Sequence, residues 1–96
     1  MNHYFFANIR INNQDEYQKY LDKVDEVFEK YNGEYLAVDT SPVILEGKWN
    51  FTKSVLIRFN NRKDFDDWYY SADYQEILKH RLVSSDSDAI LVKGLE

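Results

Sequence analysis

Residues 3–31 read HYFFANIRINNQDEYQKYLDKVDEVFEKY, and within this stretch one type of periodicity gives way to another. Over residues 3–11 alternate side chains are apolar, which is typical of a half-buried strand. The asparagine pair at 12–13 suits a helix N-cap, and the apolar residues that follow recur every three or four positions. The stretch therefore predicts a strand and then an amphipathic helix. We expect this helix to end at residues 32–33, where a glycine can take the left-handed conformation.

The same two periods continue along the chain and predict three more strands and a second helical region. The strands are expected over 34–39, 54–60 and 88–93, with an arm or strand extension at 43–45, a loop at 46–53 and a polar turn at 84–88. The helical region after residues 60–61 changes its apolar phase near 71–73, so we expect two pieces there. The order βαββαβ predicts a ferredoxin-like α+β fold with a four-stranded antiparallel sheet, its first and third strands central, and two helices on one face.

Length and composition narrow the classes of protein further. The chain has 96 residues, 44% of them hydrophobic, which predicts one globular domain over residues 1–96. Its net charge of -5 argues against nucleic acid or an anionic membrane as a partner, and no apolar run approaches the roughly 20 residues of a membrane helix. The first residues lack the features of a signal peptide, so we expect a cytoplasmic protein.

The face of the sheet away from the helices is expected to be mixed in character. It carries six side chains from the first and third strands, namely Tyr4, Phe6, Asn8, Arg10, Leu56 and Arg58, and we expect Tyr35 and Leu91 beside them. This face is too apolar for open water, so the pattern predicts a homodimer that buries it. The alternative is a solvated sheet face with scattered aromatic residues.

Most forms of catalytic chemistry find no support in the residue pattern. The chain contains no cysteine, its two histidines His3 and His80 have no metal-ligand spacing, and its three glycines are isolated. We therefore expect no metal and no cofactor. His80 is expected at the surface, and the many carboxylates are expected on solvated helix faces.

The unusual feature is an aromatic content of 17%, which is concentrated around the expected helix break. Trp68, Tyr69 and Tyr74 flank this break, and Arg81 follows two helical turns later. Such a cluster suits a small aromatic or anionic ligand, so these four residues are the candidate ligand-binding residues. Alternatively, the aromatic rings fill the core and Arg81 pairs with an aspartate at 86 or 88.

Several segments resemble the family known as domain of unknown function 1330 over essentially the whole chain. The more specific parts are LEGKW at residues 45–49, WYYS at 68–71 and YQ at 74–75 followed by Arg81. The resemblance implies a ferredoxin-like protomer in a dimeric α/β barrel and no settled activity. Members of the wider barrel superfamily include cofactor-free monooxygenases, isomerases and ligand-binding regulators, and fold does not select among them.

Three functional hypotheses remain open from the sequence. The first is a dimeric protein that binds a small organic ligand between the helices and the sheet. The second is a cofactor-independent enzyme of the oxygenase or isomerase type, with Tyr74 or Arg81 polarising the substrate. The third is an interaction module without a pocket. A cavity near Trp68 and Arg81 separates the first two from the third.

Overall fold

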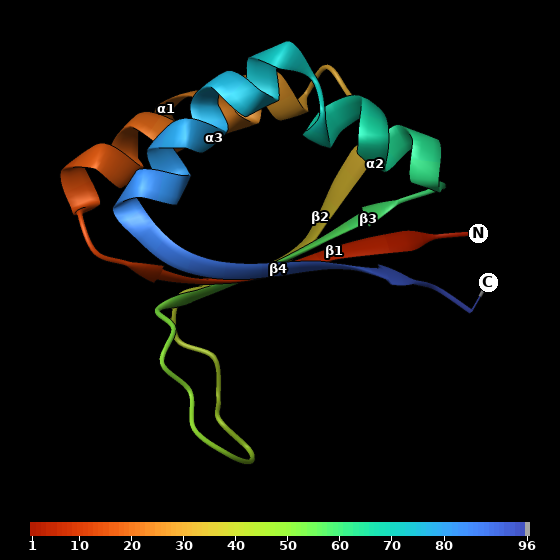
Figure 1. The fold of residues 1–96 in the computed structure, drawn as a ribbon. Coiled ribbons are helices and arrows are strands. Elements are labelled where there is room, and N and C mark those ends of the chain that lie inside the picture. Colours follow the sequence, from red (N-terminus) through yellow and green to blue (C-terminus); the bar gives the residue numbers. More distant parts are fainter. Residues whose placement is uncertain (96) are drawn as a thin grey trace.

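The computed structural model describes residues 1–95, and Glu96, the last residue of the expected domain, lies outside them. The elements are β1 (His3–Ile11), α1 (Gln14–Phe28), β2 (Gly33–Asp39), β3 (Lys53–Phe59), α2 (Arg62–Tyr69), α3 (Ala72–Ser84) and β4 (Ser85–Lys93). All three helices lie on one side of a curved antiparallel sheet (Figure 1). The expected α+β class and four-stranded sheet are confirmed. Residues 1–95 contain three helices rather than two, because the second helical region is divided into the two expected pieces. None of the helices in the described residues is long and apolar enough to cross a bilayer.

The sheet order is β2-β3-β1-β4, so the first and third strands lie in the centre as expected. Phe5, Ala7 and Ile9 of β1 face the helices and are almost completely buried. Ile57 lies opposite Phe5, and the core therefore continues across β3. The alternation of residues 3–11 thus correctly assigned the buried face of the sheet.

The expected positions of Tyr35 and Leu91 were wrong. Tyr35 lies opposite Ile57 and Leu91 lies opposite Phe5, so both face the helices. The pairing of β2 with β3 shifts between Tyr35 and Ala37, and this bulge changes which residues of β2 face the helices. On β4, Ile90 is paired with Phe6 and takes the place on the open face that Leu91 was expected to hold.

Gly33 has a different role from the expected one. It does not take the left-handed conformation and does not end α1, because α1 ends at Phe28 and Gly33 begins β2. A Cβ atom at Gly33 would lie 2.5 Å from Cζ of Phe28 and 2.7 Å from Cε1 of Phe59. Glycine is needed here because two buried rings occupy the space of a side chain.

Gly33→Ala should therefore destabilise the protein by overpacking, by about 1–3 kcal/mol in the free energy of unfolding. Urea denaturation measures this difference. Phe28→Leu removes the nearest ring atoms, so the double variant should lose less stability than the sum of the two single variants. Strict additivity of the two losses would contradict the steric explanation.

The break between α2 and α3 lies where the apolar phase slips. Ser71 is the N-cap of α3, and its hydroxyl accepts a hydrogen bond from the backbone N–H of Tyr74 at 3.2 Å. The expected polar turn at 84–88 is wrong, because α3 runs to Ser84 and β4 begins at Ser85. The backbone carbonyl of buried Ser84 accepts hydrogen bonds from the backbone N–H groups of Asn12 and Asn13. These bonds connect the end of α3 directly to the start of α1, and no turn lies between α3 and β4.

Asp73 in the first turn of α3 ties this helix to the end of α1. Its carboxylate accepts Lys30 Nζ at 3.0 Å and the Tyr31 hydroxyl at 2.9 Å. Hydrogen bonding by Ser71, then by Lys30 and Tyr31, holds the pKa of Asp73 well below its ordinary value of 3.8.

Asp73→Asn should be less stable than the wild type at pH 7. A carboxyl whose pKa is lowered by folding stabilises the fold above its unfolded pKa of about 4, and loses that effect as the pH falls towards its folded pKa. The stability difference between the two proteins should therefore shrink steadily below about pH 4. Chemical denaturation from pH 2 to pH 7 tests this, and a difference independent of pH would refute it.

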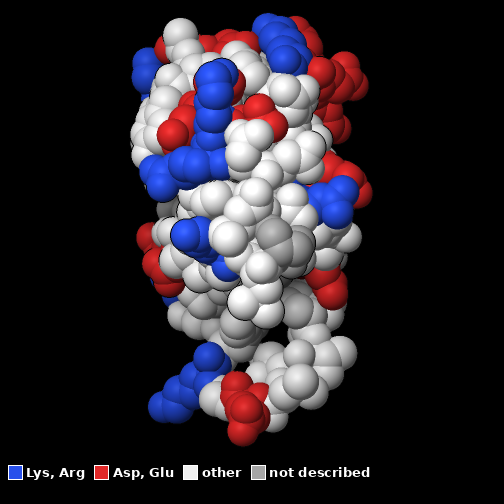
Figure 2. All heavy atoms as spheres, turned by 90° about the vertical axis from the view of Figure 1, so that its right-hand side faces the viewer, with Lys and Arg blue, Asp and Glu red and all other residues white. Residues whose placement is uncertain are grey.

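Residues 40–52 form an arm that projects below the sheet, on the side away from the helices (Figure 1). Residues 43–45 neither extend β2 nor form a strand. Val43 is 84% exposed and Leu45 is 89% exposed. Apart from Glu46 and Lys48 the arm is uncharged, and it projects at the bottom of Figure 2, while Thr52 at its base is hydrogen-bonded to Ile9.

Candidate ligand-binding site

A cavity of about 340 Å³ lies between α1 and the sheet. Three strands contribute its floor, α1 contributes one wall, and α2 and α3 contribute one residue each. The lining residues are Phe5, Ala7, Ile9, Tyr17, Tyr20, Leu21, Val24, Asp25, Tyr35, Val38, Lys53, Val55, Ile57, Trp68 and Arg81. The walls are mainly apolar, with a few polar groups converging on the space, which is typical of a small-molecule site.

Two of the four candidate ligand-binding residues, Trp68 and Arg81, line this cavity. Tyr74 is completely buried beside Trp68, with the ring centroids 4.3 Å apart, and its hydroxyl is 2.8 Å from that of Tyr20. Tyr69 lies instead along a separate groove between α2 and the strands β1 and β4, beside His3 and Arg62. The structure thus divides the four residues between the cavity wall, the layer behind it and a second groove.

Arg81 is a buried cation, only 2% exposed. Its Nη1 donates to the Ser87 hydroxyl at 3.1 Å, and its guanidinium lies over the Tyr20 ring at 5.7 Å. Among residues 1–95 no carboxylate forms an ion pair with it, and its Nε–H has no hydrogen-bond partner. The expected alternative partner Asp86 lies on the opposite face of β4 and pairs with Arg10.

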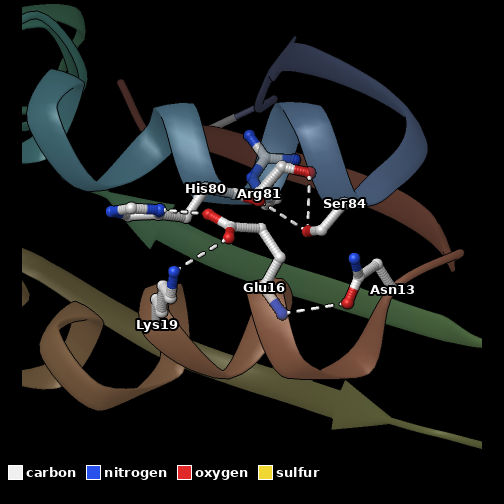
Figure 3. A network of polar contacts seen from close by, with 6 residues as sticks. All are labelled: Asn13, Glu16, Lys19, His80, Arg81 and Ser84. Atoms are coloured by element: carbon white, nitrogen blue, oxygen red, sulfur yellow. Dashed lines mark hydrogen bonds and ion pairs between the residues drawn. The ribbon is translucent and has the colours of Figure 1, made fainter.

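The last turn of α3 fixes the backbone of Arg81. The Ser84 hydroxyl donates to the carbonyls of His80 and Arg81 (Figure 3). The Ser85 hydroxyl also donates to the carbonyl of Arg81. The serines of the predicted turn therefore hold the end of a helix. Because the backbone carbonyl of Arg81 is occupied by these serines, the guanidinium is the group that Arg81 can offer to the cavity.

A second set of contacts holds α3 against α1. The carboxylate of Glu16 lies between Lys19 and the Nδ1 of His80 (Figure 3). Hydrogen bonding by His80, and then by Lys19, lowers the pKa of Glu16. His80 was expected to be a surface residue, and it is half-buried as the link between two helices rather than a group aimed at the cavity.

The tyrosines around the cavity act as neutral hydrogen-bonding groups. Burial raises the pKa of Tyr17 to about 12, and burial raises that of Tyr20 well above its ordinary value of 10.0. Burial likewise raises the pKa of Tyr74. These phenols therefore stay protonated at neutral pH and offer O–H donors.

Sequence reasoning missed Lys53 as a site residue. Its Nζ donates to the Tyr17 hydroxyl at 3.2 Å and lies 5.2 Å from the centre of that ring. Burial, and then the nearby charge of Arg81, lowers the pKa of Lys53. The available signal was its parity, because Lys53, Val55 and Ile57 alternate along one face of β3. The expected loop at 46–53 had hidden it.

The six residues expected on the open face lie there together. Tyr4 is opposite Arg58, Phe6 is opposite Leu56, and Asn8 accepts a hydrogen bond from Ser54 at 3.0 Å. Arg10 pairs with Asp86 and Arg58 with Glu34, so both arginines are neutralised within the chain. In the described part of the chain, no group of three or more histidine or acidic side chains is placed to hold a metal ion.

The architecture is that of a ferredoxin-like α+β protein, and solved structures share it. A protein of unknown function from Rhodopseudomonas palustris, RPA0582, matches with a TM-score of 0.83 at 18% identity, over 99% of this chain and 83% of that one. A dimeric ferredoxin-like protein of unknown function from Jannaschia sp. CCS1 matches with a TM-score of 0.81 at 10% identity, over 98% and 100%. SnoaB, a cofactor-independent oxygenase from Streptomyces nogalater, matches with a TM-score of 0.69 at 9% identity, over 99% and 94%.

The chain belongs to the family described as domain of unknown function DUF1330, whose model matches residues 2–95. The resemblance seen in the sequence is therefore confirmed. No curated protein matches the chain. The three structures named above share at most 18% of their residues with this chain, so they establish the fold rather than an activity.

Proposed function

We propose that this protein binds a small organic molecule in the cavity between α1 and the sheet. One observation carries the proposal, namely two buried N–H donors on the cavity wall without hydrogen-bond partners among the described residues. They are Nε1 of Trp68 and Nε of Arg81. Buried donors are nearly always satisfied, because each unsatisfied one costs about 1–3 kcal/mol. A polar ligand in the cavity would satisfy at least one of them.

The ionisable groups around the cavity favour binding over acid–base catalysis. A general base works best with a pKa near the working pH. The pKa values of Tyr17 and Tyr20 move away from neutrality, and only that of Lys53 moves towards it. An enzymatic role is the second candidate, because one structural neighbour is a cofactor-independent oxygenase. In that case the same cavity of this chain would be the substrate site.

A panel of small acids, amines and neutral aromatic compounds tests binding by thermal shift. Val55→Phe fills part of the cavity, whereas Val83→Phe makes the same change at a position that is 73% exposed on α3. At least one compound should raise the melting temperature of the wild type and of Val83→Phe, and fail to do so for Val55→Phe. A panel without any stabilising compound, or with equal stabilisation of all three proteins, would contradict the proposal.

We also propose a homodimer that buries the open sheet face, with an α/β barrel as the result. Its centre is apolar, and Ile90, which lies there beside Phe6, is 57% exposed. Four strands of about seven residues give a face of roughly 450 Å² per copy, close to half of the roughly 1,000 Å² total that a stable interface needs. The apolar arm at 40–52 projects on the same side and would add to this area. The structural neighbour from Jannaschia is a dimeric protein, which supports a homodimer.

A further inference from the structure

The two ends of the cavity differ in chemistry, and the strand register shows how. Ile9 of β1 is paired with Lys53 on one side and with Ser87, the partner of Arg81, on the other. Both cationic side chains of the cavity therefore lie at the level of Ile9. Four residues away, Phe5 contacts Trp68 with ring centroids 5.4 Å apart. The cavity thus has a cationic end and an aromatic end.

Arg81, at the cationic end, has no paired opposite charge among the described residues. Arg81 and Lys53 contribute two positive charges to the lining and Asp25 one negative charge, which leaves +1 in a chain whose net charge is -5. Asp25 is exposed, whereas Arg81 is buried, so the carboxylate does not neutralise the guanidinium. A buried cation without a paired anion is unfavourable, which makes this end attractive to an anionic group.

The shape of Arg81 selects among anions. Its guanidinium presents a planar fork of N–H donors that matches a carboxylate; Nη1 donates to Ser87, and the Nε–H has no partner among the described residues. Lys53 Nζ and the hydroxyl of Tyr17 form a second donor pair at the same level. The last turn of α3, in which the Ser84 hydroxyl bonds the carbonyl of Arg81, fixes the backbone from which the guanidinium extends (Figure 3).

The size and walls of the cavity restrict the remainder of the ligand. The four residues from Ile9 to Phe5 span about 13 Å along the strand. A volume of about 340 Å³ lies at the small end of the range for ligand sites, and suits a molecule of one or two rings. Ala7 and Val55 are paired between the two ends, and Val24 also lines the cavity, so the body of the ligand meets apolar surface.

We propose that the ligand is a small aromatic carboxylic acid, whose carboxylate is bound by Arg81 and Lys53 and whose ring lies towards Trp68. This assignment rests on the proposed ligand-binding function and specifies its chemical class. It excludes amines, which would meet two cations, and it excludes inorganic anions, which would leave the apolar part of the cavity unused.

Isothermal titration calorimetry with paired probes tests the assignment. The probes are benzoate, phenylacetate and indole-3-acetate, each compared with its neutral primary amide. At least one acid should bind the wild type more than tenfold more tightly than its amide. Arg81→Met keeps the volume of the side chain and removes the charge, so the affinity for that acid should fall more than tenfold while the affinity for the amide changes less than threefold.

Lys53→Met gives a second variant at the same end, and there the ratio of acid to amide affinity should also fall. Equal binding of acid and amide by the wild type, abolished by Val55→Phe, would overturn the anion assignment and leave ligand binding intact. Inorganic phosphate that displaces the acid at equal concentration would overturn the aromatic part. Failure of all six probes to bind would refute the assignment, and failure of the wider thermal-shift panel would in addition refute ligand binding.

Discussion

Trp68→Ala should lower the free energy of unfolding by about 3–5 kcal/mol, the usual loss for a large buried aromatic side chain. Trp68 is 1% exposed, and its ring contacts Phe5, Phe28, Phe59, Phe65, Tyr69 and Tyr74. These rings come from two strands and all three helices, so the surrounding structure cannot collapse around a smaller side chain from one side alone. A domain of this size should lose at least about 12 °C in melting temperature.

Tyr70→Ala provides the matched control, because Tyr70 follows the same helix and is 64% exposed. Its loss should stay within about 0.5 kcal/mol, as for most surface substitutions. Thermal and urea denaturation of both variants measure the contrast. A Trp68→Ala protein as stable as Tyr70→Ala would mean that Trp68 is a wall of the cavity and not a centre of the core.

Leu56→Asp should convert the proposed dimer into a folded monomer. Leu56 lies opposite Phe6 in the middle of the open face, so an aspartate would be buried there without a partner. One chain has a mass of 11.5 kDa. Sedimentation equilibrium at micromolar concentration should therefore give twice this mass for the wild type and the mass of a single chain for the variant.

Leu82→Asp makes the same chemical change at a leucine that is 57% exposed on α3. This control should remain a dimer, and circular dichroism should report native helix content for both variants. A monomeric wild type would remove the dimer proposal. A dimeric Leu56→Asp protein would assign the interface to another surface.

The sequence predicted those parts of the fold that depend on local periodicity. The alternation at Phe5, Ala7 and Ile9 identified the buried face, and the slip of the apolar phase after Trp68 located the break capped by Ser71. Both signals arise from which side chains must leave water, and the core confirms them.

Features that depend on register between distant segments were not predictable in the same way. The bulge between Tyr35 and Ala37 changes which residues of β2 point towards the helices, and the alternation of side chains in β2 alone does not predict the bulge. Gly33 looked like a helix terminator, yet the reason for glycine lies in the rings of Phe28 and Phe59, and Phe59 belongs to a different strand, β3.

The candidate site was predictable in its residue types and less so in its geometry. Trp68 and Arg81 stood out as an aromatic ring and a cation on one helical region, and both line the cavity. Lys53 was hidden in an expected loop, and Tyr17 was hidden among ordinary helix positions. A cavity is space that side chains leave unfilled, and no single residue indicates it before the helices are placed on the sheet.

The bulge in β2 has a consequence for how copies of the chain meet at high concentration. An outer strand offers unpaired N–H and C=O groups, and a straight one can recruit further copies into an endless ribbon. Here the pairing of β2 with β3 is irregular between Tyr35 and Ala37. The other outer strand, β4, carries the charged side chains Asp86 and Asp88. Growth from either outer strand is thereby discouraged, whereas the proposed contact between the open sheet faces would close after two copies, so crowding should favour a finite particle over a fibril.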